Sequence, residues 1–155
     1  MPELIKELDY FVDVGGVADV GTGPFGHRMI ASGSGGEVVG DRLKGTIAPT
    51  AGGDWLLIGQ DGYGRLDVRN TVHTVDGASI YIQLYGLIEL TPAVMAVFGG
   101  GDVPTDFGEQ YFVTTPRLET GDERYAWVNR TVFVAEARIL PGPRIDYRVF
   151  RVAHS

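Results

Sequence analysis

No stretch of this chain has the apolar spacing that a long amphipathic helix requires. Instead, short runs rich in Val, Ile, Tyr and Thr are separated by turn-forming pairs, above all Asp61-Gly62 and Asp76-Gly77. An Asp-Gly pair between two such runs is a strong signal for a β-hairpin. The 23 glycines follow no fixed period and suit the turns and bulges of an all-β fold. The pattern therefore predicts antiparallel β-structure.

The predicted strands follow one another along the whole chain, and neither a linker nor a repeat divides them. They are 8–14, 27–32, 37–39, 42–48, 55–60, 66–74, 78–90, 110–115, 125–137 and 145–152. Residues 15–26 and 33–36 are predicted as glycine-rich loop and turn. The one helix expected is short, near 91–98, with Thr91 as its cap and Pro92 in its first turn. We therefore expect one all-β domain over residues 1–155, a barrel or a sandwich of about eight to ten strands.

Composition excludes several classes of function. The chain has 13 basic and 20 acidic residues, a net charge of −7, and its basic residues are dispersed. Neither nucleic acid nor an anionic membrane is therefore an expected partner. Cysteine is absent, which removes disulfides, thiol catalysis and thiolate metal sites. The N-terminus does not resemble a signal peptide, and the longest apolar run, 93–98, is too short to span a membrane, so we expect a cytoplasmic protein.

The hairpin around Asp76-Gly77 suggests a chemical site. If these two residues alone form the turn, His73 lies opposite Ile80, and Asp67, Arg69 and His73 share a face with bulky aliphatic side chains. Such a mixed face fits a cavity lining, where Asp67 and Arg69 would pair because a lone buried charge is costly. The alternative is a solvent face with a surface ion pair. A register shift of one residue would exchange the two faces.

Several short motifs occur along the chain in a definite order and approximate spacing. They include Gly53-Asp54-Trp55, Leu66-Asp67-Val68-Arg69, Asp76-Gly77-Ala78-Ser79-Ile80-Tyr81, Pro116-Arg117-Leu118-Glu119-Thr120-Gly121 and Tyr125-Ala126-Trp127-Val128-Asn129-Arg130. With these motifs the chain resembles an uncharacterised bacterial family, domain-of-unknown-function family 3237, also called UPF0311. The resemblance implies one antiparallel β-barrel, lipocalin-like or similar to allene oxide cyclase, often as a homo-oligomer. It assigns no reaction.

Eight residues are candidates for the site. Asp67, Arg69 and Glu119 are the expected catalytic groups: an acid or base, a cation that holds an oxygen, and a carboxyl at the barrel mouth. Trp127 would stack on a ligand and Asn129 would orient it, with Asp54, Trp55 and His73 also in contact. Each has a structural alternative: Trp127 in the core, Asn129 bonded to loop backbone, Glu119 solvated, His73 exposed at the strand end.

Two functions that use a cavity remain open at this point, beside a third, a structural or interaction module whose barrel is filled by its own side chains. The first is an enzyme without metal or cofactor that catalyses an isomerisation, a cyclisation or an elimination. Its substrate would be a small, partly apolar organic molecule inside the barrel. The second is a binding barrel that holds such a molecule unchanged. The three histidines show no metal-ligand spacing, so we expect no metal site.

Overall fold

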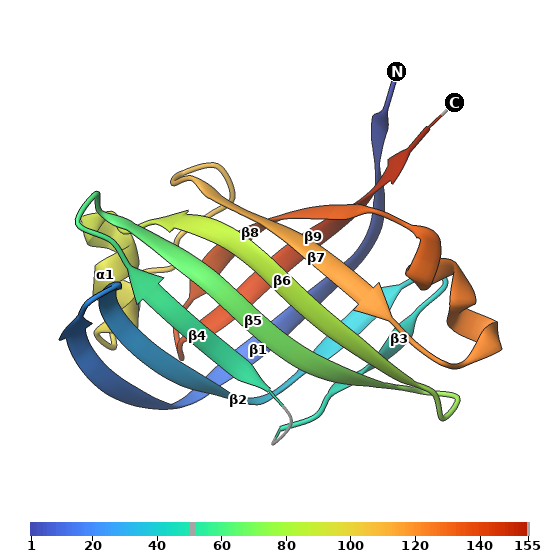
Figure 1. Cartoon of the computed structure of the whole chain (residues 1–155), viewed down its shortest axis with the longest axis horizontal. Helices are drawn as coiled ribbons and strands as arrows, with labels where there is room; N and C mark the ends of the chain where they lie inside the picture. The colour runs from blue at the N-terminus through green and yellow to red at the C-terminus, as the bar shows by residue number, and fades with distance from the viewer. Residues whose placement is uncertain (50–51, 155) are drawn as a thin grey trace.

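A computed structural model describes residues 1–49 and 52–154, and a single antiparallel sheet accounts for most of them (Figure 1). Its nine strands are β1 (Glu3–Gly23), β2 (Gly26–Gly40), β3 (Lys44–Ile47), β4 (Gly53–Ile58), β5 (Tyr63–Thr74), β6 (Ser79–Glu89), β7 (Phe112–Glu119), β8 (Phe133–Leu140) and β9 (Arg144–Ala153). Two short helical segments accompany the sheet, α1 (Pro92–Phe98) and the 3-10 helix η1 (Glu123–Arg130).

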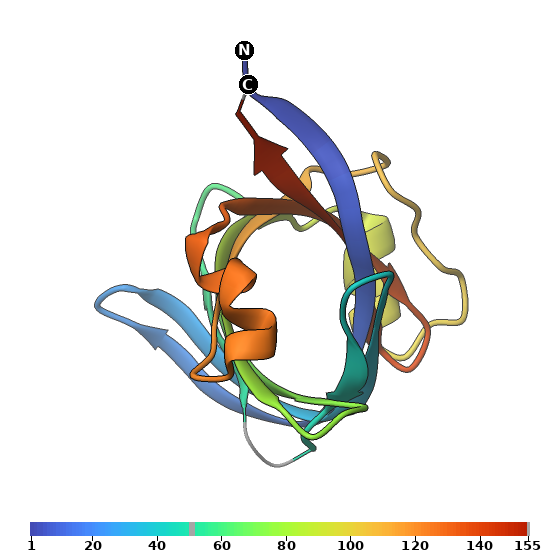
Figure 2. The same ribbon diagram turned by 90° about the vertical axis from the view of Figure 1, so that its right-hand side faces the viewer.

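The sheet closes into a barrel because β1 pairs with β9 along one edge and with β2 along the other. From β9 the order continues through β8, β7, β6 and β5. Both β3 and β4 lie between β5 and β2, each pairing with a different length of these two strands. The nine strands therefore fill eight positions around the ring (Figure 2). The predicted all-β antiparallel barrel is confirmed.

The glycine-rich N-terminal segments are strand, so their prediction as loop and turn was wrong. β1 and β2 form one long hairpin that turns at Pro24 and Phe25 and projects from the ring in Figure 2. Three register shifts in β1 mark bulges that bend it. Gly36 allows a close approach of the two strands, since a Cβ there would lie 1.9 Å from the carbonyl oxygen of Phe11.

In β5 and β8, side chains alternate regularly between the inside of the barrel and its outer wall. In β5 the residues from Gly64 to Thr74 are buried at every second position, and β8 repeats the pattern from Phe133. Aliphatic residues with no exposed surface, such as Val72 and Ile80, fill the interior. Burial of each such side chain contributes about 1.5–3 kcal/mol to stability.

The turn between β5 and β6 is one residue longer than predicted, so β5 turns its opposite face inward while β6 keeps Ile80, Ile82 and Leu84 inside as expected. His73 pairs with Ser79 rather than Ile80, and the loop holds residues 75–77. The Thr74 N–H donates to the Ala78 carbonyl at 2.9 Å, while the Thr74 hydroxyl accepts from Ala78 N and donates to Asp76. Gly77, with φ 91°, takes the left-handed conformation that closes a three-residue loop.

The two ends of the barrel differ. η1 crosses the end that faces the viewer in Figure 2, where it buries Tyr125 and Val128. Residues 125–137 were predicted as one strand. Instead, the Asp122 side chain accepts from Arg124 N and starts η1, so that β8 begins only at Phe133.

The short helix α1 lies toward the other end of the barrel (Figure 1). Its Thr91 side chain accepts from Val94 N, and Pro92 occupies the first turn, which confirms the predicted cap. No helix within residues 1–49 and 52–154 is long and apolar enough to cross a membrane.

Replacement of Gly36 by Ala is expected to destabilise the barrel by about 1–3 kcal/mol, because the new methyl group collides with the backbone of Phe11. Gly23→Ala is the matched control, since a Cβ there meets nothing within 4 Å among the residues described. Urea unfolding of both variants measures the difference. Equal stability of the two would contradict the close approach of β1 and β2.

Candidate active site

An internal cavity of about 330 Å³ opens toward the end of the barrel that carries α1 and the base of the β1–β2 hairpin. Its lining is predominantly aliphatic and aromatic, with contributions from β1, β2, β4, β5, α1 and β9. Among the described residues, the ionisable or amide side chains of the lining are Asp54, Asn70 and Tyr147. A concave apolar site with a few convergent polar groups is typical of small-molecule pockets.

Asp54 faces this cavity because of its place in β4, where it lies opposite Ala31 of β2 and Val68 of β5. Cross-strand partners share a face, and both partners line the cavity. The Asp54 carboxylate accepts a hydrogen bond from the Asp67 N–H at 3.1 Å, so the barrel wall itself holds it in place.

The surroundings of Asp54 favour its protonated form. Burial raises the pKa of its carboxyl to about 7, and the nearby negative charge of Asp67 adds to the rise. The hydrogen bond from Asp67 N and the guanidinium of Arg28 act in the opposite direction, but the cost of burial outweighs them. Asp54 can therefore take up or release a proton near neutral pH.

Two tyrosines and an amide lie deep in the barrel. The rings of Tyr10 and Tyr147 stack with centroids 4.3 Å apart. Burial raises the pKa of both hydroxyls, and the charge of Asp54 raises that of Tyr147 further, so both stay protonated. Within residues 1–49 and 52–154, the buried Tyr10 hydroxyl and Asn70 Oδ1 have no hydrogen-bond partner. The sequence analysis missed all three residues, although the correct register places Asn70 in the inward stripe of β5.

Asp67 and Arg69 lie on the outer wall, so the expectation that they face inward was wrong. The reason is the longer turn after Thr74, which pairs Asp67 with Tyr85 and Arg69 with Gln83. They form an ion pair at 3.2 Å, with side chains 28% and 46% exposed. Such a pair matches the solvent-face alternative.

Other candidates share this outer wall. Arg69 lies over the Trp55 ring at 4.9 Å, and Gln83 donates to Asp67 at 3.3 Å. His73 is exposed and hydrogen-bonds the Ser79 hydroxyl at 3.1 Å. The structure thus brings Asp54 to the cavity and leaves Trp55, Asp67, Arg69 and His73 outside it.

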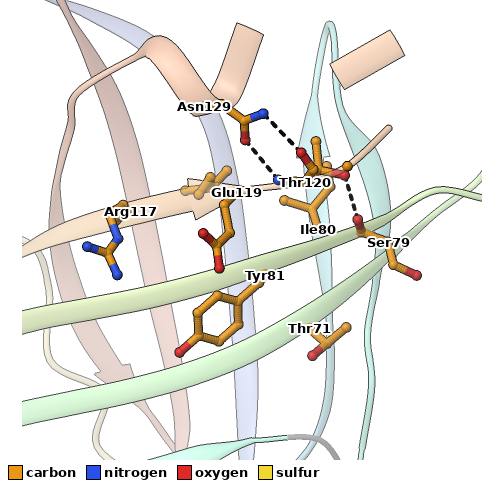
Figure 3. A pocket seen from close by; sticks show the side chains of 10 residues that line it. Thr71, Ser79, Ile80, Tyr81, Arg117, Glu119, Thr120 and Asn129 are labelled. Carbon is orange, nitrogen blue, oxygen red and sulfur yellow. Dashed lines mark hydrogen bonds between the residues drawn. The ribbon is translucent and has the colours of Figure 1, made fainter. Parts of the chain in front are cut away.

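Two of the remaining candidates, Glu119 and Asn129, line an open groove on the outer wall (Figure 3). Glu119 is the exposed last residue of β7, opposite Tyr81, rather than a turn residue. The Asn129 side chain bonds the backbone of Thr120 twice, at 2.8 and 2.9 Å, which is the structural alternative foreseen for it. Trp127 packs against the core and carries the guanidinium of Arg42 at 3.6 Å from its ring centroid.

No three His, Asp or Glu side chains among the described residues converge as a metal site would require.

The fold and the site define a closed antiparallel β-barrel with an apolar internal cavity and one acid in its wall. More particularly, the chain belongs to the DUF3237 family, described as a protein of unknown function, whose model matches residues 2–152. A UPF0311 protein of Bradyrhizobium diazoefficiens is 33% identical over 124 residues, which cover 80% of each chain.

Solved structures agree with this assignment. A conserved protein of unknown function from Rhodopseudomonas palustris superposes with a TM-score of 0.86 at 29% identity, covering 99% of both chains. A β-barrel-like protein from Acinetobacter baumannii superposes with a TM-score of 0.82 at 30% identity, and the match covers 99% of this chain and 97% of that one. An enzyme from Penicillium herquei superposes with a TM-score of 0.71 at 17% identity, which shows a shared fold. The match covers 98% of this chain and 95% of that one.

Stability should depend on pH through Asp54. Its carboxyl holds a proton up to about pH 7 in the folded chain, but only to about 3.8 when unfolded. Between these values the folded state binds more protons, so its unfolding free energy falls by about 1.4 kcal/mol per unit as pH rises. The Asp54→Asn variant has no carboxyl at this position and does not lose stability in this way. The unfolding free energy of the variant, relative to that of the wild type, should therefore increase by about 2–3 kcal/mol from about pH 5 to about pH 8.

Urea unfolding at the two pH values measures this difference. Asp61→Asn is the matched control, because its exposed carboxyl pairs with Arg65 and its pKa is lowered to about 2. A constant difference between Asp54→Asn and wild type would contradict the raised pKa.

Charged side chains near Asp54 in the barrel wall should shift the pKa of its carboxyl. Asp67→Asn keeps the backbone N–H that bonds Asp54 but removes a negative charge, so the pKa of Asp54 should fall. Arg28→Gln removes a positive charge and should raise it. Carbon NMR titration of the Asp54 carboxyl measures both shifts. Shifts of the same sign in the two variants would contradict this electrostatic coupling.

Proposed function

We propose that this protein is an enzyme that transfers protons on a small, partly apolar organic molecule held inside the barrel. The reaction belongs to the isomerisation, cyclisation or elimination type, in which one carbon or oxygen loses a proton and another gains one. Asp54 is the proton carrier. This proposal moves the chemistry from Asp67, Arg69 and Glu119 on the outer wall to the interior.

The position of Asp54 carries the proposal. A carboxyl whose pKa lies near 7 is present in both protonation states at neutral pH, as a general acid or base requires. Apolar walls formed by Leu56, Leu66 and Val68 strengthen its interaction with a substrate proton, because they exclude water. The bond from Asp67 N keeps one carboxylate oxygen fixed while the other is left for the substrate.

Tyr147 supplies a second polar group in the same cavity. Its hydroxyl remains protonated, so it can donate a hydrogen bond to a substrate oxygen that gains negative charge as Asp54 removes a proton. A base and a donor on one substrate are the minimum set for enolisation and related steps. A β-barrel of this fold from Penicillium herquei is described as an enzyme, so the architecture can support catalysis.

The predominantly apolar lining also suits a second function, a barrel that binds an organic molecule without changing it. Native mass spectrometry of the purified protein separates the two, because a binding protein retains its ligand and releases it unchanged. The cytoplasmic location and the homo-oligomer inferred from sequence stay predictions.

Proton transfer can be tested before the substrate is known. The probe is 2-tetralone, a neutral bicyclic ketone with acidic protons beside its carbonyl group, incubated with the protein in heavy water. Wild-type protein should accelerate deuterium incorporation, and the rate should rise with pH to a plateau above about pH 7, where Asp54 is ionised. Asp54→Asn should lower the rate by about 100-fold or more.

Asp61→Asn serves as the control, because it removes an exposed carboxyl near the β4–β5 turn without contact to the cavity. Its exchange rate should equal that of the wild type. Exchange that survives in Asp54→Asn at the wild-type rate would remove Asp54 from the proposed chemistry.

A further inference from the structure

Asn70 places an amide group in the apolar interior of the barrel. It lies on β5 between the inward-facing Val68 and Val72, and only 2% of its surface is exposed. Its Oδ1 has no hydrogen-bond partner within residues 1–49 and 52–154. A buried polar atom left without a partner is destabilising, so a buried amide at this position indicates a partner that binds from outside.

Space for such a partner lies directly beside the amide. Asn70 and Gly33 both line the cavity. A Cβ on Gly33 would stand 3.2 Å from the Val12 side chain and 4.0 Å from Asn70 Nδ2, so a side chain at this position would crowd the corner that Gly33 leaves to a ligand. Asp54 is the diagonal neighbour of Asn70 across β4 and β5, at a separation of about 7–8 Å that is typical of such pairs. A ligand oxygen bound at Asn70 therefore lies within reach of the proton carrier.

Charge limits what can occupy this corner. The described lining contains no Lys, Arg or His, and its one carboxyl group is that of Asp54. A carboxylate or phosphate brought into the cavity would lose its hydration without gaining a cation, and it would face a second negative charge. An uncharged hydroxyl or carbonyl group loses far less hydration free energy when it enters the cavity. The Asn70 amide can form hydrogen bonds to such a group, because its nitrogen donates and its oxygen accepts.

We propose that Asn70 anchors the polar head of an uncharged ligand, an alcohol or a ketone, whose apolar body fills the cavity toward α1. This head-group site names the substrate class of the proposed function and rests on it, since it uses the same cavity. It also assigns selectivity: the barrel accepts a neutral oxygen head and rejects the corresponding carboxylate. The apolar body would lie against side chains such as Leu66, Phe112 and Met95.

Displacement of a fluorescent probe tests this selectivity independently of catalysis. The protein is loaded with N-phenyl-1-naphthylamine, an uncharged apolar dye, and titrated at about pH 8 with 1-octanol or with octanoate, which share one chain length. We expect 1-octanol to displace the dye at a concentration about tenfold lower than octanoate. In Asn70→Leu, which keeps the number and branching of the side-chain heavy atoms but removes both polar atoms, 1-octanol should bind about tenfold more weakly.

Two further measurements locate the effect. Ala31→Phe fills the cavity beside Asp54 and should abolish dye binding, whereas displacement that survives in this variant would place the ligand outside the barrel and overturn the proposal. Asn70→Leu should also raise the melting temperature of the ligand-free protein, because it removes an unpartnered buried amide.

The outcomes separate this inference from the proposed function. Equal displacement by octanoate and 1-octanol, or an unchanged preference in Asn70→Leu, would overturn the head-group site and leave the proton exchange at Asp54 as it stands. Loss of exchange activity with intact alcohol selectivity would overturn the catalytic proposal alone. A failure of the dye to bind wild-type protein would overturn the head-group site.

Discussion

Side chains alternate between the two faces of a strand, so the hydrogen bonds of one turn decide which half of β5 and β6 the barrel encloses. The Thr74 hydroxyl and the Asp76 carboxylate support a three-residue loop, and Tyr125 of η1 donates to the same carboxylate at 2.7 Å. With this loop, Asn70 points inward and Asp67 outward. The content of the cavity thus depends on a few polar contacts at the opposite end of the strands.

The sequence predicted the architecture well where local signals act alone. Asp-Gly pairs marked the hairpins of the central strands, and Thr91 with Pro92 marked the start of α1. The prediction of strands from the sequence was wrong in the glycine-rich N-terminal segments, because glycine serves two purposes. Glycine breaks a strand in one context and permits a close approach of two strands in another, and Gly36 does the second. No local pattern separates the two uses, because the contact with Phe11 forms only when the strands pair.

The candidate site was predictable in kind but not in place. A mixed polar and aliphatic lining was expected, and the structure has one, but it is built from Asp54, Asn70 and Tyr147 rather than Asp67 and Arg69. Asp54 was foreseen only as a ligand contact, since its proton affinity arises from burial by β2 and β5, which lie apart from it in the sequence. The signal for Asn70 was present as a single polar residue in an apolar stripe, but it required the correct register.

A barrel wall is one peptide layer thick, and the bond from Asp67 N to Asp54 passes through it. A single peptide unit of β5 thereby touches the interior chemistry with its N–H group while its own side chain stands in solvent. A substitution on the outer face of this wall can therefore change the proton affinity of Asp54 on the inner face. In this family, surface divergence around β4 and β5 should change the working pH of the enclosed acid before any cavity residue is altered.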